Sequence, residues 1–281
     1  MQDFVLDDYK DWFEFVHLSR NDAGVLEVRL HRDGDVLDWA GDTLAEVGLM
    51  FGVIGQDPAN RVIVFTGTGE YFIKTADVDT TQNVPVPTES WVYADAWARR
   101  LSRNLLNIEI PIVAAVNGPC MVHSELAIMS DLIVASETAW FQDTRHFTVG
   151  RVPGDGIMLP WMRLLGPNKG RQFLLQGLRI TAQEALERGI IAEVLPQDQV
   201  LARAHDLAND LAKSKTQLLR YTRMLATREY RRDLELDGGY GAALQGLSGA
   251  EYRPGPAGLL PFPQGTNQMK SHSDRSVLAA I

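Results

Sequence analysis

Short apolar runs alternate with amphipathic stretches along most of the chain. Val25–Arg32 (VLEVRLHR) alternates apolar and polar residues as a half-buried strand does, and the turn-forming residues 21–24 precede it. Three further runs are almost wholly apolar, as strands are when both faces of their sheet are covered: RVIVFTGTG at 61–69, IPIVAAVNG at 110–118 and DLIVASETAWF at 131–141. These segments predict the strands of a buried sheet.

Two amphipathic stretches predict helices among these strands. Over residues 88–109, apolar side chains recur with a period of about 3.6, at Trp91, Ala94, Ala98, Leu101 and Leu105. Thr88 can cap the start of this helix, and Pro111 follows its end. Residues 181–189 begin with a capping box, formed by Thr181 and Glu184, and end on a glycine typical of a helix C-cap.

The order of these elements indicates the fold class. IIAEVLP at 190–196 predicts a last short strand, and the sequence becomes mostly helical from about Gln197. Because strands and helices alternate, we expect an α/β fold, with one domain over residues 1–250. Residues 251–281 are rich in proline, glycine and polar residues. They form either a mobile tail or an arm packed on a neighbouring subunit, and the apolar GLLPF and VLAAI favour the arm.

Composition and charge exclude several classes of function. The 281 residues are 45% hydrophobic and 22% charged, with a formal net charge of −9 and a pI of about 5.2. An acidic chain without basic runs argues against binding to nucleic acid or to anionic membranes. No apolar run approaches the ~20 residues of a membrane helix, and the acidic start MQDFVLDDYKDW has no signal-peptide pattern. The single cysteine, Cys120, is typical of the reducing cytoplasm, where we expect the protein.

Two of the six histidines, His123 and His146, are candidates for chemistry. Each follows a predicted apolar strand, and open α/β sheets build their ligand sites at the carboxyl ends of such strands. His123 lies two residues before Glu125 in NGPCMVHSELAIMSD, a segment that is otherwise mostly small and apolar. A buried imidazole is unfavourable unless it is hydrogen-bonded, so a partner is expected there.

His146 precedes Asp155, which stands between the glycines of VPGDG. Across the tight turn, this carboxylate can reach one ring nitrogen, fix the tautomer and leave the other nitrogen free to take a proton from water. Asp143 is a rival partner that lies closer in the sequence. The structural alternatives are a hydrogen-bonded core histidine at 146 and an N-cap role for Asp155, on a helix that begins near Gly156.

Other catalytic patterns are weak or missing. His123 and His146 with Asp155 or Glu125 could form a metal site, but no H-x-x-x-H spacing preorganises one. The sequence also has no G-x-S-x-G elbow, no phosphate-binding P-loop and no dinucleotide fingerprint. We therefore expect no bound metal.

Taken in order, these segments resemble the crotonase (enoyl-CoA hydratase/isomerase) superfamily. The likeness extends from about Val25 to Leu225, through IPIVAAVNGPC, SELAIMSDLIVASETAWFQ, GRVPGDG, GRQFLLQG and ITAQEALERGIIAEVLP. It implies a spiral of ββα turns, with a C-terminal helical region that supports homotrimers or dimers of trimers. CoA-using members have a glycine-rich run before ELA and a second catalytic glutamate, but here His123 replaces the glycines and His146 replaces that glutamate.

Within the superfamily, the chain resembles the β-diketone hydrolases. The shared features are AAVNGP, a histidine two residues before a glutamate, MSD, FQD, HF and VPGDG. The resemblance implies that His146 and Asp155 activate water, that His123 stabilises the departing charge, and that Trp39 and Glu125 line the substrate site. Two departures concern substrate identity: Leu44 stands where a further histidine is expected, and Gln245 lies near the place of a late glutamate.

This resemblance implies a CoA-independent hydrolase that cleaves a carbon–carbon bond of a cyclic or bicyclic 1,3-diketone and needs no cofactor. The small diketone would be its binding partner. The alternative is an acyl-CoA-processing crotonase, a hydratase, isomerase or thioester hydrolase, in which Lys74 or Arg151 meets CoA phosphates and Glu125 acts as acid or base. A third interpretation is a non-catalytic relative used for binding or assembly, and core packing is the alternative role for Trp39.

Overall fold

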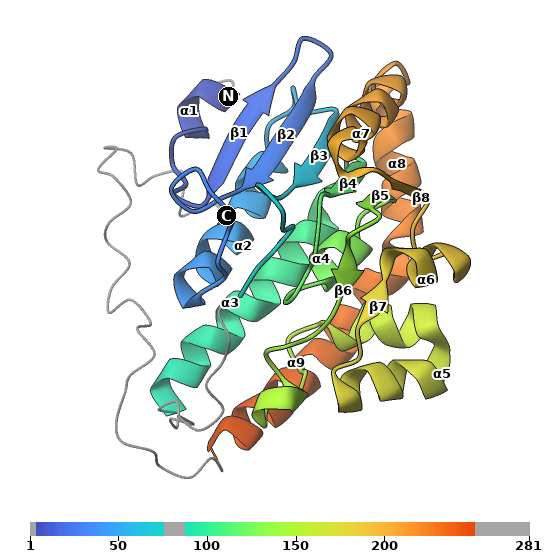
Figure 1. Cartoon of the computed structure of the whole chain (residues 1–281). Coiled ribbons are helices and arrows are strands. Elements are labelled where there is room, and N and C mark those ends of the chain that lie inside the picture. The colour runs from blue at the N-terminus through green and yellow to red at the C-terminus, as the bar shows by residue number, and fades with distance from the viewer. Residues whose placement is uncertain (1–3, 76–87, 251–281) are drawn as a thin grey trace.

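The computed structural model describes residues 4–75 and 88–250, which are built around a six-stranded sheet (Figure 1). Across the sheet the strands are β1 (Val16–Arg20), β2 (Val25–Leu30), β3 (Val62–Thr66), β4 (Ile112–Val116), β5 (Leu132–Ser136) and β8 (Glu193–Leu195). β1 pairs antiparallel with β2, and the other neighbours are parallel. A small second sheet pairs β6 (Trp140–Phe141) with β7 (Ile180–Thr181).

The predicted apolar runs form the central strands. Every residue of β3 and of β4 is buried, which confirms that both faces of this sheet are covered. The run at 131–141 is not one strand, as the sequence suggested, but two, because the chain turns between β5 and β6. In that turn the Ser136 hydroxyl accepts a hydrogen bond from the Thr138 N–H at 3.1 Å, and local bonds of this kind compete with strand pairing.

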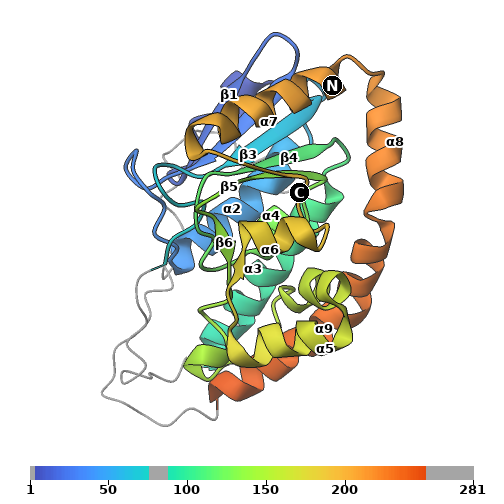
Figure 2. The same ribbon diagram turned by 45° about the vertical axis from the view of Figure 1, so that its right-hand side comes forward.

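Helices cover the two faces of the sheet differently. On one face, helix α7 (Gln197–Ala212) places small residues, among them Ala204 and Ala208, against alternate strand residues such as Val64. On the other face, α2 (Gly41–Ile54) and α3 (Thr88–Asn107) pack on the main core, which includes Phe65. Figure 2 shows α7 lying along the sheet on the side opposite α2. The period-2 alternation of the strands thus gives each face its own cluster.

Seven shorter or C-terminal elements complete the described chain. These are α1 (Leu6–Tyr9), α4 (Glu125–Ile128), the 3-10 turn η1 (Phe147–Val149), α5 (Met158–Gln176), α6 (Ala182–Glu187), α8 (Thr216–Ala226) and α9 (Arg228–Ala250). α5 is broken at Gly166, just before Pro167, where a positive φ interrupts the helix. The capping box of Thr181 and Glu184 forms as predicted at the start of α6.

The helical character after residue 197 and the helix at 88–109 are both confirmed. α3 ends at Asn107, and Ala98, Leu101 and Leu105 are buried as their spacing predicted. The cap at Thr88, the side chains of Trp91 and Ala94, and the segment 251–281 lie outside the described residues. Among residues 4–75 and 88–250, no helix is both long and apolar enough to cross a membrane.

Long helices α3 and α9 lie side by side (Figures 1 and 2). The loop that carries Asp155 approaches both, since Gly156 faces Ser102 on α3 and Gly154 faces Gly241 on α9. Gly154 approaches α9 so closely that a Cβ atom there would lie 2.0 Å from the Gly241 carbonyl oxygen. Gly156 has a φ of +118°, which an L side chain rarely adopts. The glycines of VPGDG therefore allow the close approach that the sequence indicated, and they fix Asp155 between the helices.

Candidate active site

His123 lies in the loop between β4 and α4 and points one ring nitrogen at Glu125. The distance from His123 Nδ1 to Glu125 Oε1 is 2.7 Å, and both side chains are buried. The backbone of His123 has a φ of +50°, in the left-handed region that glycine adopts most easily. His123 thus keeps a glycine-like backbone while adding an imidazole. Its Nε2 makes no hydrogen bond within the part of the chain that the structure describes.

Trp39 packs against the His123 ring, with the two ring centroids 4.4 Å apart. Its backbone is held by a hydrogen bond from the Trp39 N–H to the Lys74 carbonyl oxygen, at 2.8 Å. The indole N–H finds no acceptor among the described residues, although only 5% of Trp39 is exposed. By contrast, the fully buried Trp161 donates its indole N–H to Ser124 Oγ at 2.9 Å. The Trp39 indole therefore differs from that of Trp161 in that its donor is unused within the described chain.

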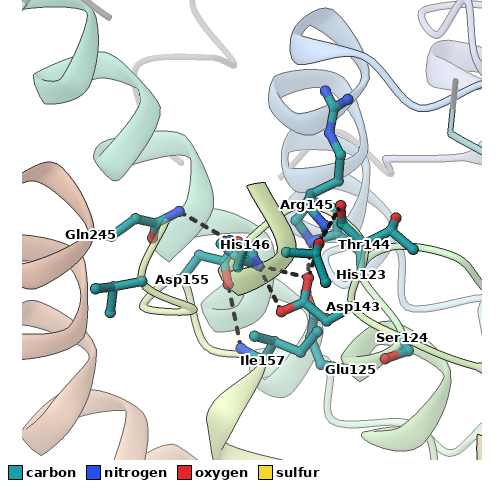
Figure 3. A network of polar contacts seen from close by, with 12 residues as sticks. His123, Ser124, Glu125, Asp143, Thr144, Arg145, His146, Asp155, Ile157 and Gln245 are labelled. Carbon is teal, nitrogen blue, oxygen red and sulfur yellow. Dashed lines mark hydrogen bonds and ion pairs between the residues drawn. The ribbon is translucent and has the colours of Figure 1, made fainter. Parts of the chain in front are cut away.

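His146 follows β6 and has a carboxylate at each ring nitrogen (Figure 3). Asp143 Oδ1 and Oδ2 lie 2.9 and 3.0 Å from Nδ1, while Asp155 Oδ2 lies 3.0 Å from Nε2. The side-chain amide nitrogen of Gln245, on α9, lies 3.1 Å from the same Nε2, to which it can donate only when Nε2 carries no proton. All three acidic and imidazole groups are buried. Two carboxylates around one ring favour the doubly protonated imidazolium, which can donate to both.

Burial and charge shift the pKa values of these groups in opposite directions. Burial alone lowers the pKa of His146, but Asp155 and then Asp143 outweigh it and hold this pKa well above 6.5. Burial raises the pKa of Asp155, yet the charge of His146 dominates and the pKa is lowered from 3.8. The buried pair is therefore ionic at neutral pH, with the proton on the imidazole side.

The pair of His123 and Glu125 holds its proton for related reasons. Burial lowers the pKa of His123, and the Glu125 carboxylate reverses this effect and raises it above 6.5. Burial also raises the pKa of Glu125, whose Oε2 is buried without a hydrogen-bond partner among the described residues. Both groups also feel the charge of Asp155, which raises their pKa further. The two histidines thus belong to one electrostatic cluster.

The structure confirms one prediction about His146 and corrects two. Asp155 does contact one ring nitrogen across the turn. The other nitrogen is not free, because Asp143, the rival in sequence, takes it with both carboxylate oxygens. Asp155 is not the N-cap of α5, which begins at Met158 with Ile157 as its cap residue, although Asp155 Oδ1 does accept a hydrogen bond from the Ile157 N–H at 3.5 Å. The predicted site residues Trp39, His123, Glu125, His146 and Asp155 nevertheless lie in one buried region.

Two contacts of this site were not predicted as such. Asp143 was weighed only as an alternative, although its spacing of three residues from His146 is the signal for a local turn. Gln245 comes from a helix 99 residues later in the chain, a distance over which no local pattern is informative. Of the positions that depart from the family, Leu44 packs against the core, and Lys74 is exposed with its ammonium 5.8 Å from the Tyr71 ring.

A separate surface cleft lies at the carboxyl ends of the parallel strands. It has a volume of about 550 Å³ and is lined by Arg29, Thr66, Gly67, Gly69, Asn117, Glu137, Pro196, Gln197, Asp198 and Leu201. None of the predicted site residues is among them. Within the described part of the chain, no group of three or more histidine, cysteine, aspartate and glutamate side chains is arranged to hold a metal ion.

Comparison with known proteins places these residues in context. The model of the enoyl-CoA hydratase/isomerase family matches residues 20–237. A β-diketone hydrolase from the cyanobacterium Anabaena sp. PCC 7120, solved with (S)-3-oxocyclohexyl acetic acid bound, is 38% identical to this chain. Its TM-score is 0.80, and the match covers 85% of this chain and 95% of that one.

Relatives named for CoA substrates are also similar to this chain. The carnitinyl-CoA dehydratase of Shigella flexneri is 31% identical over 204 residues, which are 72% of this chain and 76% of the relative. An enoyl-CoA hydratase/isomerase from Mycobacterium paratuberculosis has a TM-score of 0.77 over 85% of this chain and 94% of its own. At 23% identity, this last likeness concerns the fold alone.

Proposed function

The chain belongs to the enoyl-CoA hydratase/isomerase family, and we propose that within it this protein is a β-diketone hydrolase that acts without CoA. The reaction is a retro-Claisen hydrolysis, in which water cleaves a carbon–carbon bond of a cyclic or bicyclic 1,3-diketone to give a keto acid. The observation that carries the proposal is the buried cluster of His123 and His146, at positions where CoA-using relatives are expected to have glycines and a glutamate. The likeness to the Anabaena β-diketone hydrolase supports it.

Substrate binding uses the two donors that the protein leaves open. The Trp39 indole N–H donates to one carbonyl oxygen of the diketone. The adjacent His123 keeps Nδ1 on Glu125 and presents Nε2 to the substrate. The Glu125 carboxylate raises the pKa of His123 above 6.5, which favours the protonated ring whose Nε2–H can donate to the substrate.

Water attack requires His146 in its neutral form. Once His146 has lost a proton, Nε2 removes a proton from water as the oxygen adds to the second carbonyl carbon, forming a new carbon–oxygen bond. The carboxylates of Asp155 and Asp143 stabilise the imidazolium that results. Their charges make His146 a stronger base, at the expense of a smaller neutral fraction at pH 7.

Collapse of the tetrahedral adduct breaks the bond between this carbon and the central carbon of the diketone. The electron pair left on the central carbon is delocalised into the other carbonyl, the one that Trp39 binds, as an enolate. Hydrogen bonds from His123 and Trp39 stabilise the enolate oxygen, as oxyanion donors do. A proton returned to the central carbon by His123 or His146 completes the keto acid, so atoms and charge balance without a cofactor.

The test is to mix the purified protein with cyclic 1,3-diketones in the absence of CoA and to follow the enolate absorbance. Decay of the absorbance, with a keto acid as product, supports the proposal. Unchanged diketones, together with turnover of an acyl-CoA panel, would contradict it and favour the alternative activity.

An acyl-CoA reaction is the second candidate, because relatives such as the Shigella carnitinyl-CoA dehydratase are named for CoA substrates. In that activity Glu125 would serve as acid or base, through the Oε2 atom that lacks a partner in the described chain. Replacement of Glu125 by Gln then abolishes acyl-CoA turnover. The diketone reaction instead depends most on His146, so the two variants separate these candidates.

Assembly as a homotrimer or a dimer of trimers is part of the proposal. Apolar side chains of α8 and α9 are exposed in the single chain, namely Leu218, Tyr221, Leu225, Leu236, Tyr240 and Leu247. Surfaces of this kind commonly mark protein–protein contacts. Light scattering on the purified protein measures the mass in solution, and a monomer would contradict this part of the proposal.

A further inference from the structure

Asp143 and Asp155 hold the His146 ring in different ways. Asp143 uses both carboxylate oxygens on Nδ1, at 2.9 and 3.0 Å, and Oδ1 also accepts the Arg145 backbone N–H at 3.2 Å. All three residues belong to one tight turn after β6, so this contact depends on local backbone geometry. Only 2% of Asp143 is exposed. The carboxylate is therefore fixed in orientation before any substrate arrives.

The opposite edge of the ring meets groups from other parts of the fold. Nε2 faces Asp155, from the loop before α5, and Gln245, from α9. Asp155 is also the group whose charge reaches His123 and Glu125 in the loop after β4. The Nε2 edge thus meets groups from distant segments of the chain, while the Nδ1 edge is held by the local turn. Figure 3 shows Asp143 and Asp155 at separate positions around the ring.

We propose that Asp143 is a positioning residue that keeps a proton on Nδ1 of His146 and thereby makes Nε2 the nitrogen that exchanges protons with the reacting water. Its effect on rate rests on the proposed function, but its effect on the ring does not. In this arrangement the neutral form of His146 is the Nδ1–H tautomer. Asp155 and Gln245 then act at the working nitrogen, and Asp143 acts only through the ring.

Asp143→Leu separates these roles with a side chain that also branches at Cγ. Leu has no acceptor, so Nδ1 loses both carboxylate oxygens, while Asp155 still faces Nε2. The remaining carboxylate then favours a bare Nδ1 with the hydrogen moved to Nε2. The neutral ring then carries its proton on the wrong nitrogen for a base. Asp155→Asn leaves the Nδ1 contact intact.

The experiment records nitrogen NMR of the ¹⁵N-histidine-labelled full chain across a pH titration. The ring signals of His146 are identified as those that disappear in the His146→Gln variant. We expect the neutral ring to be Nδ1–H in the wild type and in Asp155→Asn, and Nε2–H in Asp143→Leu. Glu27→Gln is the matched control, because Glu27 contacts His205 Nε2 at 2.7 Å, far along the chain. This control should leave the His146 signals unchanged.

Kinetics with a diketone provide the second readout. Asp143→Leu should lower kcat by roughly 10²–10⁴-fold with little change in KM, the range of a lost general base. Asp143→Glu, which restores a carboxylate, should recover part of this loss. A wild-type neutral ring protonated on Nε2, or an unchanged tautomer in Asp143→Leu, would overturn the inference. Because the tautomer is read without substrate, inactivity of the wild type towards diketones would refute the proposed function and leave the role of Asp143 standing.

Discussion

The loop after β4 and the loop after β6 each bury a histidine against carboxylates, but they leave the two rings in different states. His123 has one carboxylate at Nδ1 and an Nε2 without a partner in the described chain. His146 has a carboxylate at both nitrogens and an amide beside one of them. His123 can therefore donate a hydrogen bond from Nε2, whereas His146 holds its proton between two carboxylates. Residue type and burial are alike, so the number of carboxylates distinguishes their roles.

Removing His146 should have the largest effect. Its replacement by Ala eliminates the proposed general base, so kcat for diketone hydrolysis should fall by roughly 10²–10⁴-fold. His205→Ala is the matched control, since His205 also contacts a carboxylate, Glu27, but lies elsewhere. Steady-state kinetics measure both variants. A loss of less than about tenfold in a folded His146→Ala protein would refute the assignment.

Removing His123 should cost somewhat less, because it takes away charge stabilisation and leaves the base in place. We expect His123→Asn to lower kcat by roughly 10²–10³-fold, the range for a lost oxyanion donor. The midpoint of the pH–rate profile that belongs to His146 should move only slightly. A rise in KM of the same size, with kcat unchanged, would instead indicate that His123 only binds the substrate.

The pH dependence should separate the two rings further. The rate should rise with pH through a midpoint above 6.5. His146 must first lose its second ring proton, and the charges of Asp155 and Asp143 raise the pKa for that loss. Glu125 also raises the pKa of His123 above 6.5. The positive charges of the two rings repel each other, and this repulsion partly offsets the rise in pKa. In Asp155→Asn the midpoint should move to lower pH. A midpoint at or below 6.5 in the wild type would contradict the ionic environment of His146.

Stability should change with pH in the opposite sense. His146 has a folded pKa above its unfolded value of 6.5, so its contribution to the free energy of unfolding is complete below pH 6.5. That contribution is lost as pH rises through the folded pKa. Urea denaturation of the wild type and of His146→Gln should therefore give a difference that shrinks towards alkaline pH. A difference that grows with pH would show that the ring is buried in its neutral form.

The smallest expected effect concerns the backbone at residue 123. His123→Gly and His123→Ala both remove the imidazole, but only Ala retains a Cβ at a φ of +50°. The Gly variant should be more stable by roughly 0.5–1 kcal/mol. This is the energy cost of a Cβ in the left-handed region, reduced by the greater conformational entropy that glycine has in the unfolded chain. Denaturant midpoints at pH 7 measure this difference. An Ala variant of equal or greater stability would exclude strain at this position.

Local patterns predicted the central strands, the helix at 88–109 and the helical C-terminal region, but not the helices α2 and α5. The apolar runs that became β2, β3 and β4 and the capping box at Thr181 depend on residues close in sequence, so they could be recognised directly. The break of the run at 131–141 was missed because its turn uses side-chain hydroxyls instead of glycine or proline. Strand β1 (Val16–Arg20) also went unpredicted, since its pattern is short and partly exposed.

The site was predictable residue by residue but not in its geometry. His123 and Glu125 are two positions apart, so their contact could be expected. Which carboxylate meets which nitrogen of His146 depends on a turn and on two helices that the loop approaches, and sequence spacing does not encode this. Gln245 reaches the ring from α9 only because Gly154 lets that helix approach.

The central claim is that water, activated at His146, cleaves a carbon–carbon bond of a 1,3-diketone. The most direct test incubates the purified protein with a cyclic 1,3-diketone in H₂¹⁸O without CoA and analyses the product by mass spectrometry and fragmentation. The account predicts a ring-opened keto acid with one ¹⁸O in its carboxyl group, formed by the wild type and far more slowly by His146→Ala. Recovery of the intact diketone, or equal product from both proteins, would contradict it.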